Sequence, residues 1–230
     1  MMNNAEATSR AFWHFAEANM FDKDLKDFKI LATFVHGPGL IHSNKPITSV
    51  ADLNGVKLRA PTRVINQMVS GLGATPVGMP VPAVSEGLSK GVIDGTTIPW
   101  EVTAALKVPE LVENHTEFEG PALYNLTFVL AMNEGVFNGM SADLQQIVDD
   151  NSGMNFSVFA GGTQSDADGP AREIAVEMGN NIITVSDTSE WQALVNPLYD
   201  TWVADMKGKG LDGQALIDQA KGLMSGECAG

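Results

Sequence analysis

Residues 56–79 have the sequence VKLRAPTRVINQMVSGLGATPVGM, which combines a short apolar strand, a helix and a second strand. The first strand is predicted over 56–60, the helix over 63–72 from the helical spacing of its apolar residues, and the second strand over 74–79. Two strands separated by one helix are typical of a parallel or mixed sheet with helices packed on its faces. The stretch therefore predicts an α/β fold.

The same alternation extends to both sides of this stretch. A helix is predicted over 84–90, and the apolar start of 92–97 continues the pattern. Two longer runs, FKILATFV at 28–35 and LTFVLAM at 126–132, are almost continuously apolar. Runs of this kind are typical of strands that are covered on both faces. We therefore expect both runs to be central strands of a sheet.

The last hundred residues are predicted to be mostly helical. Ser141 is expected to cap a helix whose apolar residues keep helical spacing as far as Phe159, and the spacing resumes after Pro170. Pro170 is expected to kink this helix, because its ring clashes with the carbonyl four residues earlier. One more strand is predicted over 181–185, followed by two helices.

The composition limits the classes of partner. The chain has 230 residues and a formal net charge of -14, which argues against nucleic acid or an anionic membrane because both would be repelled. Its hydrophobic fraction of 44% is sufficient for a buried core. No run reaches the roughly 18 apolar residues of a membrane-spanning helix. The first residues also lack the basic and apolar regions of a secretion signal.

The sequence offers little support for catalysis. It contains no Gly-x-Ser-x-Gly elbow, dinucleotide fingerprint or phosphate loop. His36 and His42 lack a nearby carboxylate or third imidazole, so a polar loop at a strand end is favoured and neither a metal nor a cofactor is predicted. His14 and His115 are predicted to be surface or capping residues. The alternative function is an α/β hydrolase or lyase acting on a carboxylate, in which His36, His42 or Ser43 would converge with an acid.

Arg59 is the strongest candidate for a binding residue. It lies near the C-terminal end of the strand at 56–60, where open α/β sheets bind ligands, and its guanidinium can hold a carboxylate with two parallel N–H groups. An ion pair with one of the 28 acidic residues is the alternative. A second candidate is the segment 96–101, in which Trp100 can either contact a ligand or fill the core.

Three motifs, in order and correctly spaced, carry a resemblance to a known family. They are SVADLNGVKLRAP at 49–61, LGATPVGMP at 72–80 and GVIDGTTIPWE at 91–101. These motifs closely resemble those of the substrate-binding subunit of TRAP transporters, the DctP-like family. The resemblance continues through SADL at 141–144 and GLDGQAL at 210–216, so it covers essentially the whole chain.

The resemblance implies a two-lobed, type II-like periplasmic binding protein with mixed sheets flanked by helices and a long inter-lobe helix. Such a protein catalyses no reaction. It captures a small organic acid and delivers it to the membrane permease subunits of a TRAP transporter. In the family, the arginine at the position of Arg59 pairs with the ligand carboxylate, and the positions of Thr62, Thr97, Ile98 and Trp100 also line the cleft.

Two departures from the family pattern bear on the ligand. Some members have an asparagine in place of Ile98 and a second arginine in place of Gly39. Because these polar groups are absent here, the resemblance is less consistent with a sialic acid or a uronate. It favours a less polar monocarboxylate, such as a 2-oxo or hydroxy acid with an apolar tail against Trp100.

The resemblance also implies the division into domains. Residues 1–36 and 126–165 correspond to part of lobe 1, and residues 37–125 and 166–230 correspond to lobe 2. Family members carry a further segment before the position of Met1, which includes the secretion signal and the opening strands of lobe 1. We therefore expect lobe 1 to be incomplete and to self-associate through uncovered apolar strands.

Overall fold

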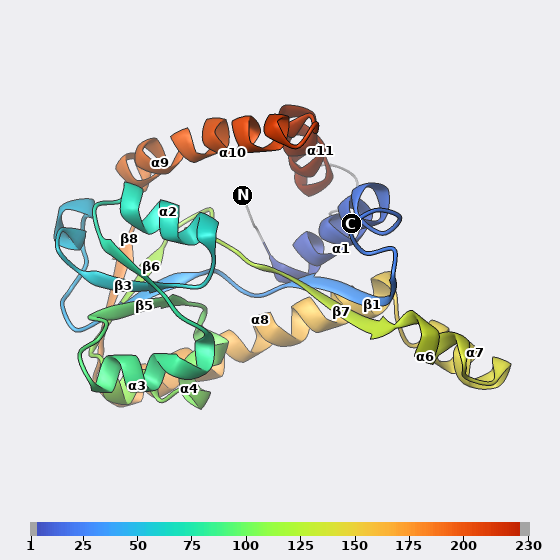
Figure 1. Ribbon diagram of the computed structural model, residues 1–230. Coiled ribbons are helices and arrows are strands. Elements are labelled where there is room, and N and C mark those ends of the chain that lie inside the picture. Colours follow the sequence, from blue (N-terminus) through green and yellow to red (C-terminus); the bar gives the residue numbers. More distant parts are fainter. Residues whose placement is uncertain (1–3, 226–230) are drawn as a thin grey trace. The chain divides into compact units, whose positions relative to one another are not determined.

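The computed structural model describes residues 4–225 and confirms the α/β architecture expected from the sequence (Figure 1). These residues form two compact units. Unit 1 comprises residues 4–37, 125–166 and 214–225, and unit 2 comprises residues 38–124 and 167–213. Within the range 4–225, no helix has the length and apolar character needed to cross a membrane.

Unit 2 is built on a six-stranded mixed sheet with the strand order β4-β3-β5-β2-β6-β8. The strands are β2 (Leu40–Ser43), β3 (Lys57–Ala60), β4 (Thr75–Gly78), β5 (Gly95–Ile98), β6 (Asn114–Phe118) and β8 (Asn181–Val185). β3 pairs in parallel with β4 and β5, and β6 pairs in parallel with β8, whereas β2 runs antiparallel to β5 and β6. The strands predicted within 56–79 and at 181–185 are therefore confirmed.

Unit 2 also contains helices, several of which pack apolar side chains against this sheet. They are η1 (Val50–Leu53), α2 (Arg63–Gly71), η2 (Val81–Ala83), α3 (Val84–Ser89), α4 (Trp100–Ala105), α5 (Val108–Leu111), the second part of α8 (Met154–Glu177), α9 (Ser189–Val195) and α10 (Pro197–Gly208). One core cluster includes Val84, Ile93 and Ile98. A second includes Leu40, Trp100 and the α8 residue Ala175.

Unit 1 has a two-stranded antiparallel sheet formed by β1 (Phe28–Val35) and β7 (Thr127–Asn133), which lie side by side in Figure 1. Its helices are α1 (Ala5–Asn19), α6 (Glu134–Asn138), α7 (Ala142–Asp150), the first part of α8 and α11 (Gly213–Ser225). The hydroxyls of Ser9 and Ser157 accept hydrogen bonds of 3.0 Å from the main-chain N–H groups of Val35 and Thr33. These hydroxyls satisfy donors along the β1 edge that faces away from β7.

β7 is mostly exposed. Only Met132 is partly buried, and Phe128, Val129 and Leu130 have exposed fractions of 37%, 38% and 43%. Within residues 4–225, β1 is the sole strand that pairs with β7. The prediction that 28–35 and 126–132 are central strands of a sheet is therefore wrong within residues 4–225, because β1 and β7 pair only with each other.

The long helical region differs from the prediction at its start. α7 ends at Asp150 and α8 begins at Met154, so the expected single helix is interrupted. Gly153, between them, has a φ of +84°, a left-handed conformation that interrupts helical geometry and that glycine adopts at little cost. α8 continues through Pro170 as one helix. The kink expected at Pro170 stays a prediction.

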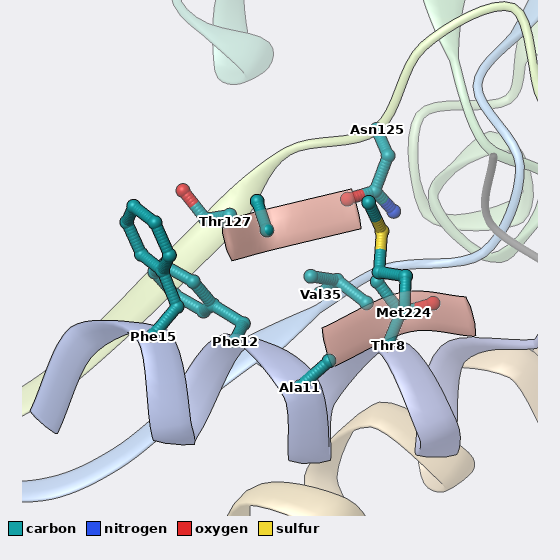
Figure 2. Close-up of a pocket in the computed structure, with 9 residues that line it drawn as sticks. Thr8, Ala11, Phe12, Phe15, Val35, Asn125, Thr127 and Met224 are labelled. Atoms are coloured by element: carbon teal, nitrogen blue, oxygen red, sulfur yellow. The ribbon is translucent and has the colours of Figure 1, made fainter. Parts of the chain in front are cut away.

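α11 belongs to unit 1, although the sequence assigned the whole of 166–230 to lobe 2. Its Gln219 accepts a 3.0 Å hydrogen bond from the side-chain amide of Asn19 on α1. Ala220 and Met224 of α11 line an apolar pocket together with α1 residues (Figure 2). The helix is therefore assigned to unit 1 by its contacts, which its position in the chain does not reveal. The other unit boundaries lie next to those expected.

Candidate functional site

Arg59 lies on β3 and is buried, with 2% of its surface exposed. Its Nε donates to the main-chain oxygen of Met79 and its Nη1 to that of Thr97, both at 3.0 Å. In the part of the chain that the structure describes, no carboxylate forms an ion pair with Arg59. A guanidinium has five N–H donors. The two contacts with main-chain oxygens use two of these donors, one on Nε and one on Nη1.

Main-chain oxygens are the hydrogen-bond partners that surround the buried charge of Arg59. A buried charge is costly unless an opposite charge or hydrogen bonds compensate it. Burial lowers the pKa of Arg59 from its usual value and the nearby Tyr124 raises it, but a guanidinium remains charged near neutral pH. An ion pair with an acidic residue, the alternative that the sequence left open, does not occur among residues 4–225. The fold thus holds a buried cation with main-chain oxygens as its hydrogen-bond partners.

Thr97 and Tyr124 adjoin Arg59. Thr97 is buried on β5, and its hydroxyl donates to the main-chain oxygen of Arg59 at 3.1 Å. Tyr124 is buried and hydrogen-bonded to the side chain of Thr97, and burial raises the pKa of its phenol above the usual value. Neutral hydroxyls beside a cation are the few polar groups that orient a ligand in a largely apolar site. The sequence analysis missed Tyr124, because no local motif distinguishes it.

Gly39 lies directly against Tyr124. Its main-chain N–H donates to the main-chain oxygen of Tyr124 at 3.0 Å, and a Cβ added to Gly39 would lie 2.2 Å from Cε1 of the tyrosine ring. No larger residue fits unless the ring moves. The ring therefore occupies the space beside position 39, where the family resemblance gives some members an arginine.

The other residues predicted for the site have roles in the fold. Thr62 is exposed, and its hydroxyl caps α2 by accepting from the N–H of Ile65. The side chain of Ile98 belongs to a core cluster. Trp100 is also buried, with its ring centroid 4.9 Å from that of His42. This packing agrees with the core interpretation of Trp100, and ligand contacts of Thr62, Ile98 and Trp100 stay predictions.

The histidines of unit 2 form a pair inside the sheet. His42 and His115 are fully buried, and their Nδ1 atoms lie 2.7 Å apart. The predictions of a loop position for His42 and a surface or capping position for His115 are therefore wrong. Ser43 donates to the main-chain oxygen of Lys45, so His42 and Ser43 do not form a nucleophile and base pair. Across residues 4–225, no group of three or more His, Cys, Asp and Glu side chains is arranged to hold a metal.

Two carboxyl groups lie close together beside α4. The main-chain N–H of Glu101 donates to Oδ1 of Asp168 at 2.9 Å. Burial raises the pKa of Glu101 to about 7, with the charge of Asp168 adding to the rise, and burial raises the pKa of Asp168 to about 6. Shifted carboxyl groups of this kind are frequent near binding sites. Glu101 therefore retains its proton in a large fraction of molecules at neutral pH.

A separate pocket of about 260 Å³ lies in unit 1 (Figure 2). Its lining is mainly apolar, with Phe12 and Phe15 from α1 and Met224 from α11. Its polar lining groups include Thr127 and Asn125, and none of its lining residues is charged. This pocket therefore offers no cation for a carboxylate, whereas Arg59 in unit 2 does.

Comparison with known families agrees with the motifs. Residues 1–205 match the family of bacterial extracellular solute-binding proteins called family 7, or DctP. The chain belongs to the DctP family. The resemblance given by the motifs around Arg59 is thus confirmed.

Solved structures of DctP-like proteins share the fold. A TRAP solute-binding protein from Rhodoferax ferrireducens T118, in complex with copurified benzoate, has a TM-score of 0.95 and 43% identity. The match covers 98% of this chain and 71% of that one. A marine metagenome TRAP solute-binding protein specific for aromatic acid ligands, in complex with 3-hydroxybenzoate, has a TM-score of 0.93 and 43% identity over 96% of this chain and 70% of that one.

Relatives in the DctP family are longer than this chain. The outer membrane transporter protein TsaT of Comamonas testosteroni is 28% identical over 225 residues, which are 93% of this chain and 64% of TsaT. The C4-dicarboxylate-binding periplasmic protein DctP of Rhodobacter capsulatus is 24% identical over 174 residues, which are 74% of this chain and 51% of that protein. The chain thus spans between half and two thirds of these relatives. The family consists of solute-binding proteins and not of enzymes.

We expect Gly39→Ala to destabilise unit 2, because the new methyl group would overlap the ring of Tyr124. Overpacking of this kind costs about 1–3 kcal/mol of folding free energy, which circular dichroism would detect as a lower melting temperature. Gly169→Ala is the control, since a Cβ at Gly169 meets no atom within 4 Å. A melting temperature that Gly39→Ala leaves unchanged would contradict the close contact.

The pair of Glu101 and Asp168 predicts that stability falls as pH rises. Both pKa values are higher in the folded chain than the usual values of 4.5 and 3.8, so between about pH 4 and 7 the folded state binds more protons than the unfolded state. The contribution of these protons to the free energy of unfolding is fully present when the pH is below the usual pKa values. It is lost as the pH rises through the pKa values of the folded chain.

Melting temperatures at about pH 5 and about pH 8 measure this loss. We expect the difference between them to be smaller in Glu101→Gln than in the wild type. Glu190→Gln, which changes an exposed residue of α9, is the control and should behave like the wild type. Equal pH dependence in all three proteins would contradict the raised pKa of Glu101.

Proposed function

We propose that the protein captures a small carboxylate ligand and delivers it to the membrane subunits of a TRAP-type transporter. The observation that carries the proposal is the buried guanidinium of Arg59, whose partners within residues 4–225 are main-chain oxygens and no carboxylate. A carboxylate accepts two parallel N–H bonds from a guanidinium and supplies the opposite charge. The proposed role is binding and not catalysis.

An aromatic monocarboxylate is the ligand class that we favour. The two structures at 43% identity are complexes with benzoate and 3-hydroxybenzoate. A TRAP periplasmic solute-binding protein from Bordetella bronchiseptica, 26% identical to this chain, holds mandelate. Beside Arg59 this chain offers the hydroxyls of Thr97 and Tyr124, which suit one carboxylate and a ring with few polar substituents.

Family membership supports the proposed location and partner. The family model describes extracellular solute-binding proteins, and related proteins of Rhodobacter capsulatus and Halomonas elongata are named as periplasmic binding proteins. We therefore propose a periplasmic location and TRAP permease subunits as the partner. The net charge of -14 gives no support for a nucleic-acid partner.

Arg59→Lys should weaken the binding of benzoate about tenfold, because an ammonium group cannot reproduce the planar two-donor geometry of a guanidinium. Arg59→Met should abolish binding, because it removes the cation. Isothermal titration calorimetry at neutral pH is the measurement. Arg63→Lys is the control, since Arg63 is exposed and pairs with Asp205.

The same titrations should include 3-hydroxybenzoate, mandelate and galacturonate, with an assay for turnover of each acid. Benzoate affinity retained in Arg59→Met, in a wild type that binds benzoate, would overturn the role of Arg59. Formation of a product from any of these acids would instead favour the hydrolase or lyase.

We further propose that the chain self-associates through β7. Exposed apolar residues on an edge strand promote pairing with a second chain, and Phe128, Val129 and Leu130 form such a run. The wild-type chain should be dimeric or larger by size-exclusion chromatography with light scattering, and Val129→Lys should shift it toward a monomer. Leu144→Lys, on α7, is the control at another exposed apolar position. A wild type that is monomeric at all concentrations tested would refute this contact.

A further inference from the structure

A row of buried polar side chains crosses the sheet of unit 2. The register pairs Arg59 of β3 with Thr96 of β5, Thr96 with His42 of β2, and His42 with His115 of β6. Residues paired in this way carry their side chains on the same face of a sheet. None of the four has more than 2% of its surface exposed. The arginine assigned to the ligand therefore lies in one row with the two imidazoles.

The hydrogen bonds of the two imidazoles have a single direction. The side-chain amide nitrogen of Asn180 lies 3.0 Å from Nε2 of His115, 2.8 Å from the main-chain oxygen of Pro109 and 3.3 Å from that of Val112. An amide nitrogen can only donate, so Nε2 of His115 accepts and Nδ1 carries the proton. That proton is donated to Nδ1 of His42, 2.7 Å away. Nε2 of His42 then donates to the main-chain oxygen of Ile98 at 3.2 Å.

Both imidazoles are neutral in this arrangement. Burial, together with the neighbouring His115, lowers the pKa of His42 to about 3. Burial lowers the pKa of His115 to about 4, against a smaller rise caused by Glu117. A proton added to Nδ1 of His42 would place two N–H donors opposite each other at the 2.7 Å contact, and a proton added to Nε2 of His115 would face the amide N–H group of Asn180. The two imidazoles therefore form one series of hydrogen bonds with a fixed order of donors and acceptors.

This series of hydrogen bonds ends at Ile98, the last residue of β5, next to the candidate site. Ile98 follows Thr97, whose main-chain oxygen accepts from Nη1 of Arg59. Ile98 also precedes Pro99 and Trp100, and the ring of Trp100 packs at 4.9 Å from both imidazole centroids. His42 is thus hydrogen-bonded to Ile98, and Ile98 is the neighbour of Thr97, whose main-chain oxygen accepts from Arg59.

We propose that His42 and His115 are positioning residues for carboxylate binding, because they fix the end of β5 and with it the oxygen of Thr97 that orients Arg59. This inference takes its ligand from the proposed function, but the hydrogen bonds of the two imidazoles do not depend on that function. A pair that only filled the core would affect stability and leave the orientation of Arg59 unchanged. The experiments therefore separate orientation from stability.

The first measurement is the ¹⁵N spectrum of the imidazole groups in the full chain near neutral pH. We expect His115 to carry its proton on Nδ1 and His42 to carry its proton on Nε2, both neutral. The Nδ1–H form is the less common one for a histidine in water, so its presence in His115 identifies the direction of the hydrogen bonds from His115 through His42 to Ile98. A proton on Nε2 of His115, or a charged ring at either position, would overturn the proposal.

The second measurement is benzoate affinity in three variants. His42→Leu removes both hydrogen bonds and should weaken binding about tenfold. His42→Gln retains an acceptor and a donor at the end of a side chain of similar length, and should restore affinity to within about threefold of the wild type. Leu53→Ala, a buried residue of η1 outside the row, should lower the melting temperature without changing affinity. Equal affinity in His42→Leu and Leu53→Ala would overturn the positioning role.

A wild type that does not bind benzoate would count against the proposed ligand class and still leave the positioning role open to test. The NMR signal of the Arg59 Nε–H group, which donates to Met79, then replaces affinity as the readout. We expect His42→Leu to shift or broaden this signal and Leu53→Ala to leave it unchanged. An Arg59 signal that is identical in the wild type and His42→Leu would overturn the positioning role.

Discussion

The candidate site depends on the hydrogen bonds between the guanidinium of Arg59 and the main-chain oxygens of Met79 and Thr97. These contacts follow from the order of the strands. β3 lies between two parallel neighbours, β4 and β5, and the carboxyl ends of parallel strands meet at the same edge of a sheet. The fold therefore brings two main-chain oxygens to Arg59, and within residues 4–225 no side-chain carboxylate pairs with it.

A second set of contacts holds the segment that follows β5. Glu117 of β6 accepts from the indole N–H of Trp100 at 2.9 Å and from Nε of Arg172 at 2.7 Å. One turn earlier on α8, Asp168 accepts from the main-chain N–H of Glu101. The start of α4 is thus fixed by α8 and β6, while the imidazole pair binds the residue at the end of β5. Within unit 2, these contacts limit the movement of the strand end that carries Thr97.

The sequence predicts those helices and strands that are determined by the spacing of apolar residues within one segment. The strands and helix of 56–79 follow from apolar spacing alone, and Arg59 is conspicuous because it ends a strand. β6 was not predicted, because Asn114, His115 and Thr116 are polar residues that are stable in a sheet only through distant partners. Thr116 donates to the main-chain oxygen of Ile47, and His115 binds His42. Tyr124 was missed for the same reason, since Gly39, which lies against its ring, is far away in the chain. The central position predicted for β1 and β7 was wrong within residues 4–225, since an apolar run does not show how many strands pair beside it.

A crystal structure of the chain with benzoate tests the central claim most directly. The account predicts that the carboxylate lies within hydrogen-bonding distance of Nη1 and Nη2 of Arg59, with the ring close to Tyr124. It also predicts that Nε and Nη1 keep their contacts with the oxygens of Met79 and Thr97. Benzoate bound instead in the apolar pocket between α1 and α11 of unit 1, with no anion at Arg59, would contradict the account.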